Sequence, residues 1–228
     1  MADQNKGMSD LWRRLRFVFL AIVVYRMGTH IPIPGIDPAR LAALFDQNQG
    51  TILEMFNLFS GGALERMSIF ALNVVPYISA AIIMQLFSNS IPYLQELKKD
   101  GQAGRNQITQ YTRYGTVVLA FVQASALSVT LGASGLAYEP GTSFFISAVF
   151  SVVAGTVFLM WLGEQITERG IGNGISIIIA TSILTGIPGA IGQALEQARQ
   201  GDLNILLLLG IGVLAMVVIA IVVFIERG

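Results

Sequence analysis

Long runs without a charged residue constrain this sequence more than any other feature. A helix needs roughly 20 mostly apolar residues to cross the roughly 30 Å hydrocarbon core of a bilayer. The segments of about that length that contain no Asp, Glu, Lys or Arg are 67–87, 116–138, 144–162, 171–194 and 203–225. A further apolar segment, 17–33, is interrupted only by Arg26, whose side chain we expect to snorkel toward the outer interface. We therefore predict an all-α integral membrane protein with six transmembrane helices.

The few charged residues, 12% of the chain, also predict its orientation. An even number of spans puts both ends of the chain on the same side of the membrane. Basic residues are concentrated in the N-terminal segment 1–16 and the loops 92–113 and 163–170, so the positive-inside rule places these parts in the cytoplasm. The segments 34–66 and 195–202 then face the opposite side, and both termini are cytoplasmic.

The segment between the first two predicted spans does not have the pattern of a span. Ile31-Pro32-Ile33-Pro34-Gly35 cannot continue a helix, because proline lacks an N–H and disfavours helical geometry in the residue before it. A short helix is expected over 39–47, and a moderately apolar stretch, 51–59, is followed by the break Ser60-Gly61-Gly62. Non-helical backbone at membrane depth is tolerated only where protein or a water-filled cavity surrounds it. Two interpretations stay open: an extracytoplasmic loop with an interfacial helix, or a re-entrant half-helix inside a cavity.

The residue types that catalysis requires do not form a recognisable site. The chain has no cysteine and one histidine, His30, which excludes thiolate and histidine metal clusters. The glycines within 170–174 lack the spacing of a nucleotide-binding loop, and we expect them to allow a sharp turn and a close approach of helices. Glu164, Glu168 and Arg169 are expected beside them in a solvated turn. We predict no enzymatic activity, no cofactor and no metal, and the zero net charge provides no field that would attract nucleic acid.

Two of the predicted spans carry aliphatic residues at helical spacing. Val74 and Ile78 lie one turn apart in the second span, as do Ile175 and Ile179 in the fifth. This spacing fits ordinary helix packing as well as the lining of a pore. No mid-span carboxylate, which ion-coupled transport usually requires, accompanies these residues.

Several longer motifs resemble the SecY family, the central subunits of bacterial protein-conducting channels. The run SIFALNVVPYISAAIIMQLF at 68–87 is similar to the signature of the family's second span, and WLGEQITERGIGNGIS at 161–176 is similar to its other signature. The motifs IPIPG at 31–35, FSGGAL at 59–64 and QYTRYG at 110–115 also match in the family's order, so the resemblance covers nearly the whole chain. It implies the N-terminal half of a clamshell of ten spans in two inverted halves, with about six spans in this chain.

The resemblance also assigns roles to particular residues. A broken plug half-helix is implied over about 51–67, with its core at Phe59, Ser60, Gly61, Gly62, Ala63 and Leu64. A pore ring at mid-membrane is implied for Val74, Ile78, Ile175 and Ile179. A lateral gate, through which signal sequences leave for the lipid, is implied for Ser79, Ile82 and Gln85. Asn73 departs from the pattern because the family usually has glycine there, and we expect its amide to bond to the plug or to a neighbouring helix.

The function implied is that of the pore-forming subunit of the protein translocase in the bacterial cytoplasmic (inner) membrane. Such a subunit passes unfolded secretory polypeptides across the membrane and releases membrane segments laterally. The implied partners are the SecE and SecG subunits, the SecA motor or the ribosome on the cytoplasmic face, signal sequences, nascent polypeptide and lipid. The chain ends after the sixth predicted span, so we expect the remaining spans on a longer or a separate chain.

Three other classes of membrane protein fit this sequence less well. Half of a secondary transporter is the chief alternative, and it predicts a coordinating polar group in mid-span that the sequence does not offer. A membrane scaffold without a pore would need neither a plug-like segment nor an aliphatic ring. An intramembrane enzyme would need histidine pairs, acid pairs or a Ser/Lys arrangement at depth.

Overall fold

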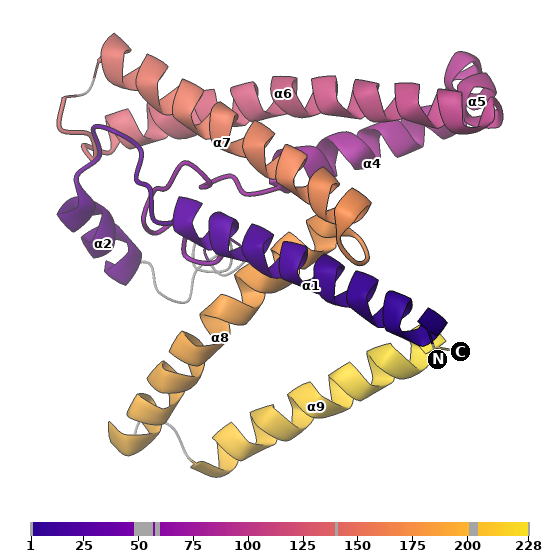
Figure 1. Ribbon diagram of the computed structural model, residues 1–228. Helices are drawn as coiled ribbons and strands as arrows, with labels where there is room; N and C mark the ends of the chain where they lie inside the picture. Colours follow the sequence, from indigo (N-terminus) through magenta and orange to yellow (C-terminus); the bar gives the residue numbers. More distant parts are fainter. Residues whose placement is uncertain (1, 48–56, 58–59, 140, 201–204, 228) are drawn as a thin grey trace. The chain divides into compact units, whose positions relative to one another are not determined.

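The computed structural model describes residues 2–47, 57, 60–139, 141–200 and 205–227, and within these ranges the regular structure is helical. The helices are α1 (Ala2–Gly28), α2 (Pro38–Gln47), α4 (Val75–Ser90), α5 (Pro92–Lys99), α6 (Gly101–Ala133), α7 (Thr142–Arg169), α8 (Gly174–Gln200) and α9 (Ile205–Arg227) (Figure 1). The described residues contain no strand, only two isolated backbone bridges. The predicted all-α fold is therefore confirmed.

Two helices in the described part of the chain are long and apolar enough to cross a bilayer. They are α6, which includes residues 116–133 of the predicted segment 116–138, and α7, which includes the whole predicted segment 144–162. Shorter apolar stretches lie within α8, at Gly174–Gly189, and within α9, at Gly210–Glu226. The count of six spans stays a prediction.

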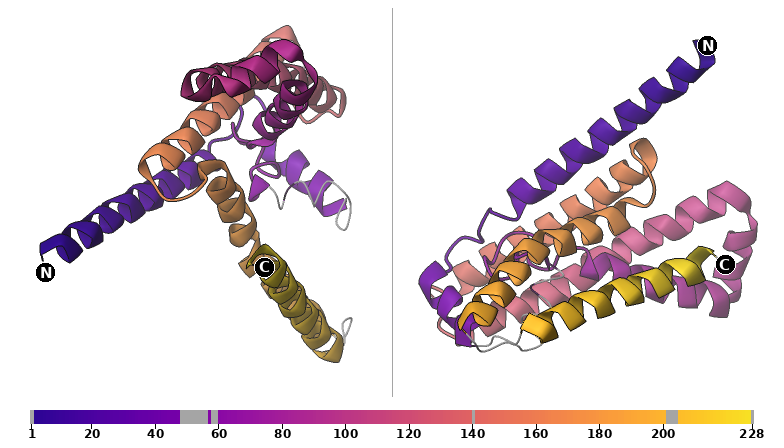
Figure 2. Two further views of the ribbon diagram at one scale, coloured as in Figure 1. Left: turned by 90° about the vertical axis from the view of Figure 1, so that its right-hand side faces the viewer. Right: turned by 90° about the horizontal axis from the view of Figure 1, so that it is seen from below.

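The chain divides into two compact units, residues 1–183 and residues 184–228. In the first unit α4 lies beside α6, α5 connects them at one end, and α6 also packs on α7 (Figures 1 and 2). Helix α1 contacts α7. The second unit contains the end of α8 and all of α9, and every α9 side chain from Gly210 to Glu226 is exposed, as suits a helix with apolar residues on all faces.

Local sequence explains where the helices begin and end. Helix α1 ends at Gly28, ahead of the Ile31–Gly35 motif, and α2 begins after Asp37, whose carboxylate accepts a 2.9 Å hydrogen bond from the Ala39 N–H. The predicted short helix over 39–47 is thus confirmed. Helix α4 begins only at Val75, with Pro76 in its first turn, whereas the second span was predicted from residue 67. Residues 61–67 and 69–74 form turns.

The turns before α4 are held by backbone pairing with the loop that follows α1. The Ile33 N–H donates to the Met67 carbonyl at 2.8 Å, and the Ile69 N–H donates to the Ile31 carbonyl at 3.0 Å. A second bridge joins Ile36 to Ala137, in the connection between α6 and α7. These bonds satisfy backbone groups that a helix would have paired, so the irregular segment can be buried.

Glycine lets this irregular segment lie directly on α7. A Cβ atom at Gly155 would clash with the carbonyl oxygen of Ile69. The turn between α7 and α8 uses a similar contact, because a Cβ atom at Gly174 would clash with the carbonyl oxygen of Gly163. The predicted close approach of helices at this second turn is confirmed.

We expect Gly155→Ala to destabilise the protein by about 1–3 kcal/mol, because the added methyl group must displace backbone. The matched control is Gly132→Ala in α6, where a Cβ atom meets nothing within 4 Å. Thermal unfolding in detergent should show a lower Tm for Gly155→Ala and an unchanged or slightly higher Tm for Gly132→Ala. Equal Tm values for the two variants would contradict the close contact.

Candidate functional site

The residues assigned to a pore ring and part of the proposed plug lie in one apolar cluster. Val74 and Ile78, at the start of α4, and Ile175 and Ile179, at the start of α8, belong to the same core as the fully buried Ala63. We call these five residues the ring–plug cluster. Val74 is buried and the three isoleucines are partly buried. The fold therefore gathers aliphatic side chains that are about 100 residues apart in the sequence.

The segment 60–64, which contains Ala63, consists largely of turns. Gly61 and Gly62 have φ values of 66° and 78°, in the left-handed region that glycine enters without steric cost. The Ser60 hydroxyl donates to the Asn57 carbonyl at 2.9 Å and accepts a hydrogen bond from the Leu64 N–H at 3.1 Å. Ser60, Gly61 and Ala63 are buried, and Gly62 and Leu64 are partly buried. Phe59, the remaining residue of the predicted plug core, lies outside the described residues.

A buried polar network connects this segment to α1, to the turn before α4 and to α8. The Tyr25 hydroxyl lies 2.5 Å from Ser182 Oγ and donates to the Ser60 carbonyl at 3.3 Å. The Asn73 amide donates to Ser182 Oγ at 3.2 Å. Tyr25, Asn73 and Ser182 are at most 4% exposed. We call these three side chains the Tyr25–Asn73–Ser182 network.

Asn73 combines two properties that the sequence did not reveal together. Its φ is 49°, so its backbone adopts the left-handed conformation that glycine favours and that asparagine tolerates better than most residues. Its side chain bonds to Ser182 on α8, which is one of the two partners expected for it, a neighbouring helix. The positive φ explains why the resembling family usually has glycine at this position.

Arg26 does not behave as the sequence predicts. Its Nη1 donates to the Gly61 carbonyl at 3.1 Å and is partly buried, whereas we expected the side chain to snorkel to the outer interface. The left-handed turn at Gly61 and Gly62 leaves a carbonyl within reach of α1. Arg26 therefore provides a second hydrogen bond from α1 to the segment 60–64.

Stacked aromatic rings support the same region from the side of α7. The Tyr25 and Phe70 rings are nearly parallel with centroids 6.0 Å apart, and Phe70 stacks in turn on Phe158 at 5.9 Å. Phe70 follows the bridge at Ser68 and is itself buried. The stack fixes the position of the Tyr25 ring and hence of its hydroxyl.

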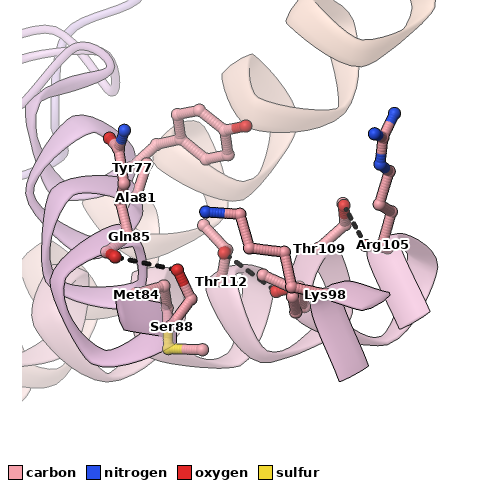
Figure 3. A pocket seen from close by; sticks show the side chains of 10 residues that line it. Tyr77, Ala81, Met84, Gln85, Ser88, Lys98, Arg105, Thr109 and Thr112 are labelled. Atoms are coloured by element: carbon pink, nitrogen blue, oxygen red, sulfur yellow. Dashed lines mark hydrogen bonds between the residues drawn. The ribbon is translucent and has the colours of Figure 1, made fainter. Parts of the chain in front are cut away.

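The predicted lateral-gate residues lie on α4 and do not belong to the ring–plug cluster. Ile82 and Gln85 are exposed, and Ser79 is partly buried. Gln85 lines a cavity of about 420 Å³ between α4, α5 and α6, with Lys98 and Arg105 among its lining residues and no Asp or Glu. Figure 3 shows the Lys98 side chain extending toward α4, while Ser88, Thr109 and Thr112 bond to carbonyls of their own helices. This end of the α4–α6 pair is therefore polar and cationic.

Glu164 was expected in a solvated turn with Arg169, and this prediction was wrong. The Glu164 carboxylate accepts a 2.7 Å hydrogen bond from Nε of Arg113, which lies on α6, and the Glu164 side chain is only 18% exposed. Helix α7 runs on to Arg169, so Glu164 lies within the helix on the side of α6. The ion pair joins these two helices near one end.

Sequence reasoning missed Tyr25, Ser182 and the Arg113–Glu164 pair as functional residues. A signal for Ser182 was available, since it follows Ile175 by seven residues and Ile179 by three and so falls on the same helical face. Tyr25 is the one tyrosine of the segment 17–33. Their proximity depends on the tertiary fold, which no local pattern specifies.

A family model, curated relatives and solved structures all match this chain, and all of them describe protein-translocation channels. The family model for SecY matches residues 68–228. The Protein translocase subunit SecY of Pseudomonas aeruginosa is 64% identical over 227 residues, which are 100% of this chain and 51% of that protein. This chain thus spans about half the length of that curated relative.

Solved channel structures share the fold. Sec61 in a canine ribosome-channel complex from the endoplasmic reticulum matches with a TM-score of 0.60 and 20% identity, over 86% of this chain and 43% of that one. A structure concerned with the plug domain of SecY, described as stabilising the closed state of the translocation channel, matches with a TM-score of 0.56 and 21% identity. That match covers 86% of this chain and 42% of the other.

We expect the Arg113–Glu164 ion pair to couple α6 to α7 by about 1 kcal/mol, because the pair is only partly exposed. A double-mutant cycle with Arg113→Gln and Glu164→Gln, measured by thermal unfolding, gives this coupling energy. The control cycle uses Arg13 and Asp10, whose side chains are 75% and 42% exposed, and should give a coupling near zero. A zero value for both cycles would show that the α6–α7 pair does not contribute.

Proposed function

Because this chain belongs to the SecY family, we propose that it forms the N-terminal half of the wall of a protein-conducting channel. The channel passes unfolded secretory polypeptides across the bacterial cytoplasmic membrane and releases membrane segments sideways into the lipid. The observation that carries this proposal is the ring–plug cluster. A buried, non-helical segment packs there against aliphatic side chains from two helices, as expected of a closure inside a channel.

The chemistry of the ring suits a substrate without a fixed sequence. Val74, Ile78, Ile175 and Ile179 offer no hydrogen bond and no charge, so they have no specific attraction for any one passing segment. A narrow hydrophobic constriction also resists ions, because water leaves it and an ion cannot shed its hydration shell there. A conduit for arbitrary polypeptide needs both properties.

The segment 60–64 acts as the plug of the closed channel in this proposal. Its burial beside the ring supports the assignment, as does the internal hydrogen bonding through Ser60. A cavity of about 480 Å³ lies next to it, lined by Ser60, Leu64 and Asn73 together with residues of α6. This space gives the segment room to move without first displacing a packed helix.

The exposed side of α4 serves as part of the lateral gate in the same proposal. Ile82 faces outward from α4, so a signal sequence leaving the pore could bind there while its apolar residues enter the lipid. Lys98 and Arg105 are suited to the cytoplasmic side by the positive-inside rule, which also puts both termini there. SecE and SecG are the proposed companion subunits, and the SecA motor or the ribosome binds the cytoplasmic face.

We expect Ile78→Asp combined with Ile179→Asp to raise the resting ion conductance of the complete channel, because two carboxylates would hydrate the constriction. Planar-bilayer recording measures this leak directly. The matched control, Ile78→Leu combined with Ile179→Leu, keeps the apolar surface and should leave the leak at the wild-type level. If the aspartate variant leaks no more than wild type, the ring assignment is wrong.

The function itself is tested by cross-linking a polypeptide that is stalled during translocation. A bifunctional reagent attached to Ile78→Cys should capture the stalled chain, because the substrate must pass the ring. The chain has no native cysteine, so the introduced thiol is unique within it. Phe150→Cys on α7, which is 67% exposed and outside the ring–plug cluster, is the control and should capture lipid-facing material only. Failure of Ile78→Cys to capture substrate in an active channel would argue against a pore at this site.

A further inference from the structure

The Tyr25–Asn73–Ser182 network lies between the ring and the proposed plug. Asn73 directly precedes Val74 of the ring, and Ser182 follows Ile179 by one helical turn on α8. On its other side the Tyr25 hydroxyl contacts the carbonyl of Ser60, the first residue of the segment 60–64. The network therefore connects four parts of the chain at the place where the apolar closure ends.

The protons of the network can be assigned in one continuous direction. Asn73 donates its amide N–H to Ser182 Oγ, the Ser182 hydroxyl donates to the Tyr25 oxygen, and the Tyr25 hydroxyl donates to the Ser60 carbonyl. Ser182 Oγ also lies 2.9 Å from the Ile178 carbonyl, which is the alternative acceptor for its single proton. A separate hydrogen bond, from the Arg26 guanidinium to the Gly61 carbonyl, also joins α1 to this segment. Two neighbouring carbonyls of the segment 60–64 are thus held by side chains of α1.

We infer that Tyr25, Asn73 and Ser182 are positioning residues that form a polar latch, which holds the segment 60–64 in the closed channel and sets how readily it opens. This inference rests on the proposed function. Displacing the segment breaks the Tyr25–Ser60 bond, and moving α8 away from the start of α4 breaks the Asn73–Ser182 bond. Either of these two movements therefore costs at least one buried hydrogen bond.

The apolar contacts of the ring–plug cluster do not supply this property. Aliphatic packing has no direction, so Ala63 could slide along the ring while remaining in contact with it. Hydrogen bonds depend on distance and angle and are lost after a small displacement. The latch makes the closed position a defined state, and water or a translocating backbone can replace its bonds once the pore is open.

The latch is tested in the complete channel, made free of cysteine elsewhere, with the reporter Leu64→Cys in the segment 60–64. The rate of its reaction with a membrane-impermeant maleimide measures how often the segment is exposed. We expect Tyr25→Phe, which removes one hydroxyl, to raise this rate roughly 3- to 15-fold, the range for loss of one buried hydrogen bond in a membrane protein. Asn73→Gly should act similarly, because glycine accepts the left-handed φ and removes only the amide. Adding Ser182→Ala to Tyr25→Phe should raise the rate further, since Ser182→Ala also removes the acceptor of the Asn73 amide.

Two controls separate a latch from general loosening. Tyr138→Phe alters an exposed tyrosine and should leave the Leu64→Cys rate unchanged. A second reporter, Leu131→Cys, is buried in the core against which Leu64 also packs, and it should stay unreactive in every variant. Wild-type reactivity of Leu64→Cys in both Tyr25→Phe and Asn73→Gly overturns the latch, as does an equal rise at Leu131→Cys.

Translocation measured in the same proteoliposomes keeps the latch and the proposed function distinguishable. Latch variants should raise the ratio of translocation with a defective signal sequence to translocation with an intact one. If the wild-type channel translocates and the variants change neither this ratio nor the thiol reaction, the latch alone is wrong. If the wild-type channel translocates no preprotein, the proposed function fails, and the thiol rates still report on the latch.

Discussion

Hydrogen bonding of a non-helical backbone inside an apolar core is the constraint on which this structure depends. The turns over 61–67 and 69–74 pair only some of their N–H and C=O groups with one another. Leaving the others unpaired in an apolar membrane environment would cost several kcal/mol for each group. The loop after α1 provides part of the solution through Ile31 and Ile33, and side chains of α1 provide more through Tyr25 and Arg26. The first helix therefore supports this segment through hydrogen bonds from its side chains.

Apolar and polar interactions have separate tasks around the candidate pore. In the proposed channel the ring–plug cluster excludes water and ions, and its aliphatic side chains make no directional bond. The Tyr25–Asn73–Ser182 network and the Phe70 stack fix positions, because their geometry tolerates little displacement. A channel that must stay closed at rest and yet accept any polypeptide sequence can use both kinds of interaction. The apolar contacts seal it, and the neighbouring hydrogen bonds fix the closed position.

Much of the fold followed from the sequence, while the polar contacts did not. Charge-free runs predicted the apolar helices α6 and α7, proline and glycine predicted the break after α1, and helical spacing put Ile175 and Ile179 on one face. The late start of α4, at Val75, was missed because the turns before it are as apolar as a span and are stabilised by distant residues. The Arg113–Glu164 and Tyr25–Ser182 contacts join residues 51 and 157 positions apart, and no local pattern contains that information.

At Asn73 the backbone requires only a residue that accepts a positive φ, whereas the side chain provides a separate hydrogen bond to Ser182. Glycine and asparagine both fit this φ, so an exchange between them would leave the path of the chain unchanged and alter only one donor group. The strength of the closure could then drift by single substitutions during evolution without any refolding of the channel. A position of this kind would allow related channels to differ in their tolerance of imperfect substrates while keeping a common architecture.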